Sequence, residues 1–315
     1  MKKTKLPKEQ TLPGEGIVAK KKKKLLSQTK AQVGLPGPPR SVMPKLPLDT
    51  QVQFVLLSFQ WGQAPLPPDT YEVACETLCR EPHEHRILLH PGESWGDNWV
   101  WPTGTDVVTE QARKHGFSVL FEAPSPEGSF YFAYDKEKGL LQERCRQTFA
   151  SSGEAEDAKN RELIQDFFNA CQKDGSRTLT VGGVDLGLLI CGENNILYNK
   201  QSDGNRVSVR HHSGEDIFDD VRVVLNGAHS VMGNWGKLER RFEYLSRDKR
   251  FMFYTTNNTK SWWTTSLRVY YDGQRLADGK GIWKDDLFPI KMVKDPQDRF
   301  RALVVDVPYR DLCSE

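Results

Sequence analysis

Three apolar segments of strand length in this 315-residue chain end in side chains that could carry out chemistry. The segment "ILLHPGE" ends in Glu93, "GLLICGE" delivers Cys191 and Glu193, and "VVLNGAHS" delivers Asn226 and His229. In layered α/β proteins, ligands bind outside the carboxyl ends of strands, so such side chains meet at one sheet edge. A thiol and a carboxylate at that edge would suit a cysteine hydrolase, because a thiol needs a base or a nearby positive charge to become a nucleophile.

Cys191 has two interpretations when its own stretch, "VDLGLLICGENN", is taken alone. Free cysteine is among the most buried residue types, so Cys191 could simply fill core. It could instead be a nucleophile on a strand-to-loop turn, with its sulfur facing a pocket lined by the following Glu193 and Asn194. His229 is similarly open, because a polar loop histidine either lines a pocket or hydrogen-bonds to its own backbone.

Strand and helix patterns alternate along the chain from about residue 50. Apolar β-rich runs predict strands or hairpins at 52–60, 85–93, 117–123, 129–147, 177–191, 198–212, 221–230, 251–258, 266–279 and 301–309. Helical spacing of apolar residues predicts helices at 68–81, 107–116, 155–175 and 235–250. This alternation indicates a layered α/β domain over residues 50–315, and the hairpins favour mixed sheets over purely parallel ones.

The first 48 residues have a different composition. They contain the run Lys20–Lys24, scattered prolines and no aromatic residue. Residues 1–50 carry 12 basic and three acidic side chains, a net charge of +9, while the remainder carries 32 basic and 39 acidic, a net charge of −7. Such a segment cannot bury enough apolar surface to fold, so we predict a disordered basic arm. Its lysine run is a solubilising tail or, as the less favoured alternative, a nucleic-acid contact.

The six cysteines contain no CxxC pair or zinc-like spacing, and the chain begins without a secretory signal. We therefore expect reduced thiols in a cytoplasmic protein. No apolar run approaches the roughly 18 residues of a membrane span, so no membrane association is expected. His211 and His212 are adjacent, and neighbouring residues of a strand point to opposite faces, so we expect no metal site there.

Set in order, these segments resemble the nitrilase or carbon–nitrogen hydrolase superfamily over roughly residues 52–309. "RILLHPGE" resembles the family element that ends in its catalytic Glu, here Glu93, and "VDLGLLICGE" resembles the element that carries its nucleophile, here Cys191. Three later segments follow in the family's order: "VRVVLNGAHS", "LERRFEYLSRDKRFMFYTTNN" and "SLRVYYDGQRLADG".

The chain departs from the family pattern in three places. Glu93 follows Pro-Gly, with one extra residue before the carboxylate, and we expect Gly92 to permit an unusual turn there. The family's catalytic Lys is missing, and the segment "LLQERCRQTF" offers Arg146, with Arg144 as a competitor. An apparent hairpin insertion at 198–212 follows the cysteine. Arginine keeps the positive charge but does not readily donate its proton.

The resemblance implies a four-layer α-β-β-α sandwich with mixed sheets, homo-oligomeric assembly and no cofactor or metal. It implies hydrolysis or acyl transfer at a non-peptide carbon–nitrogen bond, in a small amide or nitrile, through a thioester acyl-enzyme. Cys191 would attack, Glu93 would be general base and acid, and Arg146 would stabilise the oxyanion. The remaining candidates for substrate binding and support are Glu154, Glu193, Asn194, Asn226 and His229.

Two alternatives stay open. The missing Lys would also fit a catalytically inactive nitrilase-like scaffold that binds a small molecule or a partner protein. In the other alternative, the Lys20–Lys24 arm binds nucleic acid and the folded domain is a platform.

Overall fold

The structure is a computed structural model in which two units are distinguished, Met1–Ser41 and Val42–Glu315. It describes residues 46–60, 66–92, 103–125, 128–172, 175–200, 204, 206–212, 214–218, 221–229, 234–257 and 265–313. Glu93, the run Lys20–Lys24 and nearly all of the predicted arm lie outside these residues. The arm and its boundary at residue 48 therefore remain predictions.

A seven-stranded mixed sheet forms one half of the second unit. Its strand order is β14-β15-β1-β2-β3-β4-β5. The central strands β1, β2 and β3 are mutually parallel, and the other neighbours pair antiparallel. The bounds are β1 Gln51–Phe59, β2 His85–Leu89, β3 Ser118–Ser125, β4 Gly128–Asp135, β5 Gly139–Cys145, β14 Ile290–Lys294 and β15 Phe300–Pro308.

A six-stranded mixed sheet forms the other half, in the order β13-β12-β11-β10-β7-β6. Strands β7, β10 and β11 are parallel, and the outer strands pair antiparallel. The bounds are β6 Thr178–Val181, β7 Val184–Ile190, β10 Val223–Ala228, β11 Phe251–Thr256, β12 Leu267–Tyr271 and β13 Gln274–Asp278. The predicted mixed sheets are confirmed.

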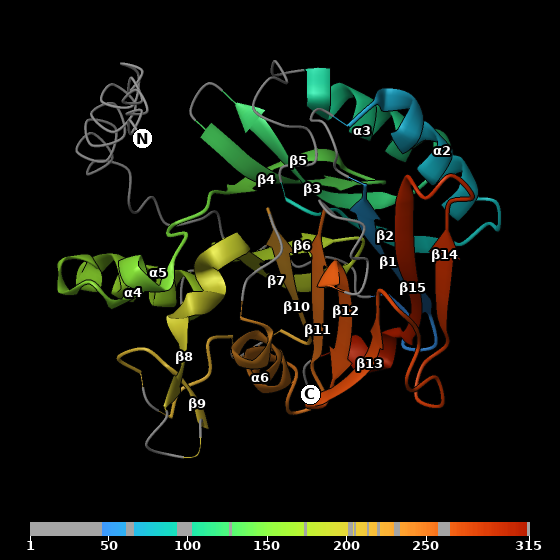
Figure 1. Ribbon diagram of the computed structural model, residues 1–315. Helices are drawn as coiled ribbons and strands as arrows, with labels where there is room; N and C mark the ends of the chain where they lie inside the picture. Colours follow the sequence, from blue (N-terminus) through green and yellow to red (C-terminus); the bar gives the residue numbers. More distant parts are fainter. Residues whose placement is uncertain are drawn as a thin grey trace, which may run out of the picture. The chain divides into compact units, whose positions relative to one another are not determined.

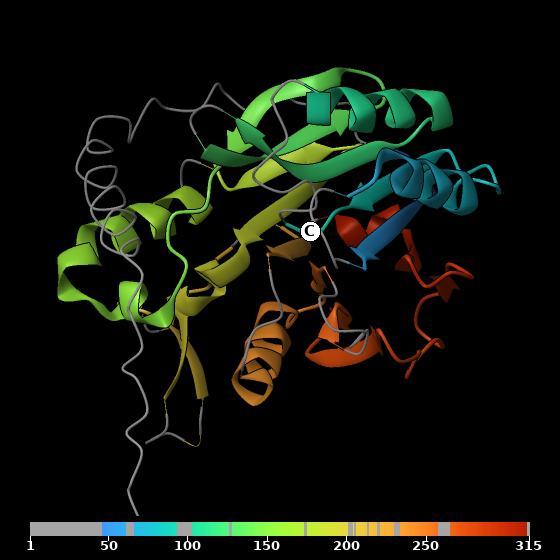
Figure 2. The same cartoon turned by 45° about the horizontal axis from the view of Figure 1, so that its top comes forward.

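Helices cover the outer faces of both sheets (Figure 1). Helices α2 (Pro68–Leu78) and α3 (Thr103–His115) pack on the seven-stranded sheet, whereas α5 (Arg161–Gln172) and α6 (Trp235–Leu245) pack on the six-stranded one. Between the sheets lies a third apolar cluster, contributed by inward residues of both. The turned view of Figure 2 shows the resulting layers. The predicted four-layer α-β-β-α sandwich is confirmed.

The segment predicted as one helix at 155–175 is instead broken. Helix α4 (Ser152–Glu156) ends at Asp157, whose backbone is extended with ψ of 122°. The Asp157 side chain then accepts a hydrogen bond from the amide of Lys159 and starts the short 3-10 helix η1 (Ala158–Asn160), which leads into α5. An aspartate that caps the next helix competes with continuation of the first, which the apolar periodicity could not show.

The predicted hairpin after Cys191 is confirmed as β8 (Leu197–Lys200) and β9 (Arg206–Val209). These two strands form a small sheet of their own beside α6 (Figure 1). Two 3-10 helices complete the described elements, η2 (Cys191–Ile196) directly after β7 and η5 (Tyr309–Leu312) at the end of β15.

The carboxyl ends of the parallel strands of both sheets lie at the same edge of the sandwich. The amide of Gly92, just after β2, donates to the carbonyl of Ala228 at the end of β10 over 3.1 Å. The hydroxyl of Ser58 near the end of β1 donates to the carbonyl of Thr256 at the end of β11 over 2.7 Å. Side chains at the ends of β2, β3, β7 and β10 are therefore neighbours, which the sequence analysis required for a site.

Candidate active site

Cys191 occupies a strained turn directly after β7. Its φ is +46°, in the left-handed region that side chains other than glycine rarely adopt. Strand alternation sends Leu188 and Ile190 toward the opposite sheet, so a continued strand would turn residue 191 outward. The left-handed turn ends the strand, and the half-buried Cys191 packs against the cluster between the sheets. Strain of this kind costs on the order of 1–3 kcal/mol and gathers at functional sites.

His229 follows β10 and points between the sheets by the same alternation. Val223 and Leu225 belong to the cluster between the sheets, whereas Val224 and Ala228 pack on the outer helices. Residue 229 therefore continues the inward set. In the parallel register, Gly227 is level with Ile190, so His229 lies just beyond the level of Cys191. The two side chains are within hydrogen-bond reach of each other.

Glu122 completes a triad from the facing sheet. It lies on β3, two residues after the inward Leu120, and its side chain is 2% exposed. Its carboxylate contacts the Nε2 atom of His229 through both oxygens, at 3.1 Å for Oε1 and 2.8 Å for Oε2. Cys191, His229 and Glu122 thus lie in the order thiol, imidazole and carboxylate, an arrangement that can serve nucleophilic catalysis.

The electrostatics of the triad favour a protonated His229. Burial alone lowers the pKa of this imidazole, but hydrogen bonds with Cys191 and Glu122, together with their charges, raise it to about 11. At neutral pH the ring therefore carries its proton and a positive charge next to the thiol. A positive charge next to a thiol is one of the settings in which cysteine acts as a nucleophile.

Gly92 is required by a close approach rather than by an unusual turn. A Cβ at this position would collide with the ring of His229 and lie 2.8 Å from Oε2 of Glu122. Its carbonyl accepts a hydrogen bond from Asn257 over 3.1 Å, so the chain is anchored on both sides at this point. Gly92 lies in a turn, and it is not among the glycines with a left-handed φ. The next residue, Glu93, lies outside the described residues.

Asn226, predicted for substrate binding, hydrogen-bonds to the turn that carries Cys191. Asn226 alternates outward from β10, and its amide nitrogen donates to the carbonyls of Leu189 and Cys191 at 3.1 and 3.2 Å. Its oxygen accepts from Asn194 over 3.2 Å, and Asn194 also donates to the Cys191 carbonyl over 3.0 Å. Both amides hold the turn that carries Cys191 from the side away from His229.

Glu193 is a structural anchor instead of a substrate ligand. The fully buried carboxylate accepts from Arg177 at 2.8 and 3.0 Å and from the amides of Ile190 and Thr148. Burial raises the pKa of the Glu193 carboxyl, while the charge of Glu193 raises the pKa of the Arg177 guanidinium against the opposite effect of burial. The hydrogen bonds from Arg177 and two backbone amides all favour the ionised carboxylate. Arg177, which lies just before β6, also donates to the carbonyl of Arg146 and so ties the start of β6 to the segment that follows β5.

The predicted cations Arg144 and Arg146 and the predicted supporting carboxylate Glu154 lie at exposed positions. Cys145 of β5 faces inward, so Arg144 lies on the outer face, over the ring of Phe130 at 4.5 Å. Arg146 is exposed beyond the end of β5, which is not the water-excluded setting of an oxyanion site. Glu154 is also exposed, and its side chain accepts a hydrogen bond from the amide of Ala150 at the start of α4.

Glu122 was not among the residues predicted from the sequence, although the alternation of residues along its strand contained a signal. In "SVLFEAP", a carboxylate occupies an inward position of an otherwise apolar strand, and charged residues are almost never fully buried unless paired. Among the described residues, no group of three or more His, Cys, Asp or Glu could hold a metal ion. All six cysteines are free. No described helix is long and apolar enough to cross a membrane.

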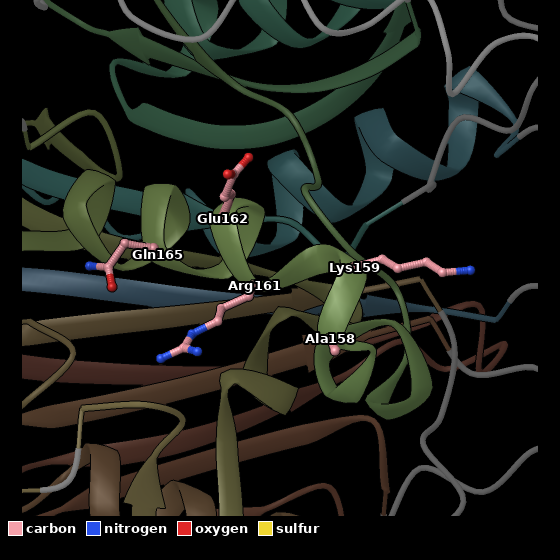
Figure 3. A pocket seen from close by; sticks show the side chains of 5 residues that line it. All are labelled: Ala158, Lys159, Arg161, Glu162 and Gln165. Carbon is pink, nitrogen blue, oxygen red and sulfur yellow. The ribbon is translucent and has the colours of Figure 1, made fainter.

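A surface hollow of about 520 Å³ lies over η1 and α5, away from the triad residues in sequence and element. Its walls are Ala158, Lys159, Arg161, Glu162 and Gln165. Figure 3 shows that the charged side chains diverge from one another there. A binding site needs polar groups that converge on a ligand, so this hollow is not a candidate site.

The fold is that of nitrilase-superfamily amidases. A mutant of the amidase from Nesterenkonia sp. AN1, with the acetamide moiety of fluoroacetamide covalently added at its active-site cysteine, superimposes with a TM-score of 0.50 and 14% identity over 85% of this chain and 95% of that one. A cysteine mutant of that amidase in complex with butyramide has a TM-score of 0.49 and 14% identity over 84% and 94% of the two chains. No family model and no curated protein matches the sequence.

Proposed function

We propose that this protein is a cysteine-dependent hydrolase of small amides, working through a thioester acyl-enzyme. The observation that carries the proposal is the hydrogen-bonded set Cys191–His229–Glu122 at the carboxyl ends of β7, β10 and β3. It answers the question of the missing lysine, because the protonated His229 supplies the positive charge beside the nucleophile that Arg146 does not supply.

In acylation, the Cys191 thiolate attacks the carbonyl carbon of the amide and the carbonyl oxygen becomes an oxyanion. When the tetrahedral intermediate collapses, the carbon–nitrogen bond breaks and His229 donates its proton to the leaving amine. The products of this half-reaction are a free amine and a thioester on Cys191. Glu122 stabilises the imidazolium before the transfer and fixes the orientation of the ring throughout.

In deacylation, a water molecule attacks the thioester, and the neutral His229 takes one of its protons. The second intermediate then releases the carboxylic acid and restores the thiolate and the imidazolium. Glu93 keeps its proposed role as a further acid or base, because it follows Gly92, whose backbone is anchored between Ala228 and Asn257 beside the triad.

The substrate class is taken from the similar fold. Structures of the Nesterenkonia amidase contain butyramide and acrylamide in cysteine mutants and a fluoroacetamide-derived adduct. We therefore expect short aliphatic amides to be turned over, with release of ammonia. The cytoplasmic location expected from the cysteine spacing in the sequence is part of this proposal.

Fluoroacetamide labelling followed by peptide mass spectrometry tests the proposal directly. One acetamide moiety should attach to the peptide that contains Cys191, and the five other cysteines serve as internal controls. Cys191→Ala should abolish both this adduct and ammonia release from butyramide. Equal labelling of all six cysteines, without amide turnover, would instead support the inactive scaffold.

The arm calls for a separate experiment. Deleting residues 1–45 and measuring binding to a short DNA or RNA duplex at several salt concentrations tests the nucleic-acid alternative, because phosphate contacts make binding strongly salt-dependent. Unchanged binding after the deletion would remove that alternative without affecting the hydrolase proposal. Size-exclusion chromatography of the same two proteins tests the expected homo-oligomer.

A further inference from the structure

The strained turn that carries Cys191 is held by side chains on the outer side of the six-stranded sheet. Asn194 and Asn226 both donate to the Cys191 carbonyl, at 3.0 and 3.2 Å. One residue further on, Asn195 donates to the carbonyl of Gly192 over 2.8 Å. Because a left-handed φ at a residue with a side chain is unfavourable, the conformation at Cys191 persists only where such contacts over-determine it.

Arg241 connects this turn to helix α6. Its Nη1 atom donates to the side-chain oxygens of Asn194 and Asn195, at 2.9 and 2.8 Å. Because Arg241 binds the side-chain oxygens of Asn194 and Asn195, their NH₂ groups point the other way. These NH₂ groups donate to the carbonyls of Cys191 and Gly192 in the turn. A single guanidinium therefore fixes the orientation of two of the amides that bind the turn.

The environment of Arg241 is costly for a purely structural arginine. The residue is 7% exposed, and its hydrogen bonds within the described chain go to neutral amides instead of a carboxylate. Its Nε atom is buried without a hydrogen-bond partner among the described residues. Burial lowers the pKa of this guanidinium to about 10, which still leaves it charged at neutral pH. An unsatisfied buried donor costs about 1–3 kcal/mol, so the fold gives up stability to keep this cation against the turn.

We propose that Arg241 is a positioning residue for the nucleophile: through Asn194 and Asn195 it holds the turn at Cys191 in the conformation that presents the thiol to His229. The inference rests on the proposed function for its consequence in catalysis, but its geometric content is independent of which substrate is used. Loss of the guanidinium lets the turn relax from the left-handed conformation and moves the sulfur away from the imidazole.

The test measures the rate at which iodoacetamide alkylates Cys191 in the full chain, together with kcat and KM for butyramide. Arg241→Met should slow alkylation by about 10- to 100-fold, since a shift of about 1 Å at reacting atoms costs up to 100-fold. It should lower kcat by a similar factor and leave KM within about threefold, because KM reports binding and not the position of the nucleophile. Arg241→Lys restores a cation and should recover part of both losses.

Arg250→Lys is the matched control. Arg250 is 6% exposed and bonds to Asp216 and to the carbonyls of Phe218 and Val221, which are not part of the Cys191 turn. It should lower the unfolding temperature without slowing alkylation. The proposal is overturned if Arg241→Met and Arg241→Lys both alkylate at the wild-type rate, or if Arg250→Lys slows alkylation equally. If no variant hydrolyses amides but alkylation still depends on Arg241, the proposed function fails while the positioning role stands.

Discussion

Two buried carboxylates lie near Cys191, and they differ in the side chain that each one binds. Glu193, on the turn itself, is fully buried and bound to Arg177, while Glu122, on the facing sheet, is equally buried and bound to His229. A guanidinium keeps its proton through any reaction, whereas an imidazole can release one and take it back. The partner of each carboxylate, and not its burial or its distance along the chain from Cys191, decides which pair can take part in catalysis.

The comparison also shows what each pair fixes. Arg177 lies just before β6 and Glu193 lies on the turn η2. Their side chains bind the backbone of Arg146, Thr148 and Ile190. The Glu122–His229 pair joins the two sheets through side chains alone. Removing the first should therefore act mainly on stability, and removing the second mainly on chemistry.

The largest expected effect is that of His229→Asn. Without an imidazole, neither thiol activation nor proton donation to the amine is supplied, and general acid–base groups contribute about 10²–10⁴-fold each. We expect kcat/KM for butyramide to fall by about 10³- to 10⁴-fold. The unfolding temperature should also fall, because the buried Glu122 carboxylate loses its charged partner. Activity within about tenfold of wild type, a loss smaller than a general acid–base group contributes, would contradict the triad.

Glu122→Gln and Glu193→Gln form a matched pair of isosteric changes. Glu122→Gln should lower kcat/KM by about 10²- to 10⁴-fold, as for an orienting carboxylate in a triad. Glu193→Gln should instead lower the free energy of unfolding by about 3–5 kcal/mol, since it leaves the buried Arg177 charge uncompensated. Kinetics and urea unfolding of both variants give the two readouts. The reverse pattern would exchange the roles of the two carboxylates.

Gly92→Ala probes the space beside the Glu122–His229 pair. The added methyl group would overlap the His229 ring and press on Glu122, so the imidazole must shift away from Cys191. A displacement of this size is expected to reduce kcat by about 10- to 100-fold. Gly116→Ala is the control, because open space surrounds its Cβ position and its cost is confined to the backbone strain of φ +68°. An unchanged kcat in Gly92→Ala would show that the triad tolerates displacement.

The smallest expected effect is the pH dependence. Since the pKa of His229 is raised to about 11, kcat/KM should not fall between pH 7 and pH 10, where an unperturbed imidazole is already neutral. The raised pKa of His229 also makes the free energy of unfolding depend on pH. The contribution of the charged ring is fully present below about pH 6.5, the ordinary pKa of histidine, and is lost as pH rises through about 11. The difference in unfolding free energy between wild type and His229→Asn should therefore shrink as pH rises, and a constant difference would argue against a charged His229.

Much of the fold, and the position of Cys191 at the end of a strand, could be predicted from the sequence by itself. Apolar runs of strand length and helical spacing predicted most of the strands and helices in their order, because local patterns report which residues face the core. Strand β14 and the break between α4 and α5 were not predicted. The segments around Cys191 and Gly92, taken in order, indicated the architecture and the position of the thiol at a strand end.

Only the tertiary structure decided which side chains meet Cys191. Glu122 lies 69 positions earlier in the numbering and on the other sheet, and the contact that brings it to His229 depends on how two sheets face each other. Other candidates lay in the motifs that the sequence analysis used: Arg146, Glu154, Glu193 and Asn226. Some of these side chains face outward, and the others are engaged in hydrogen bonds within the fold. The sequence determines the face on which each residue lies along its own strand, whereas packing between the sheets, a long-range property, determines which faces oppose each other.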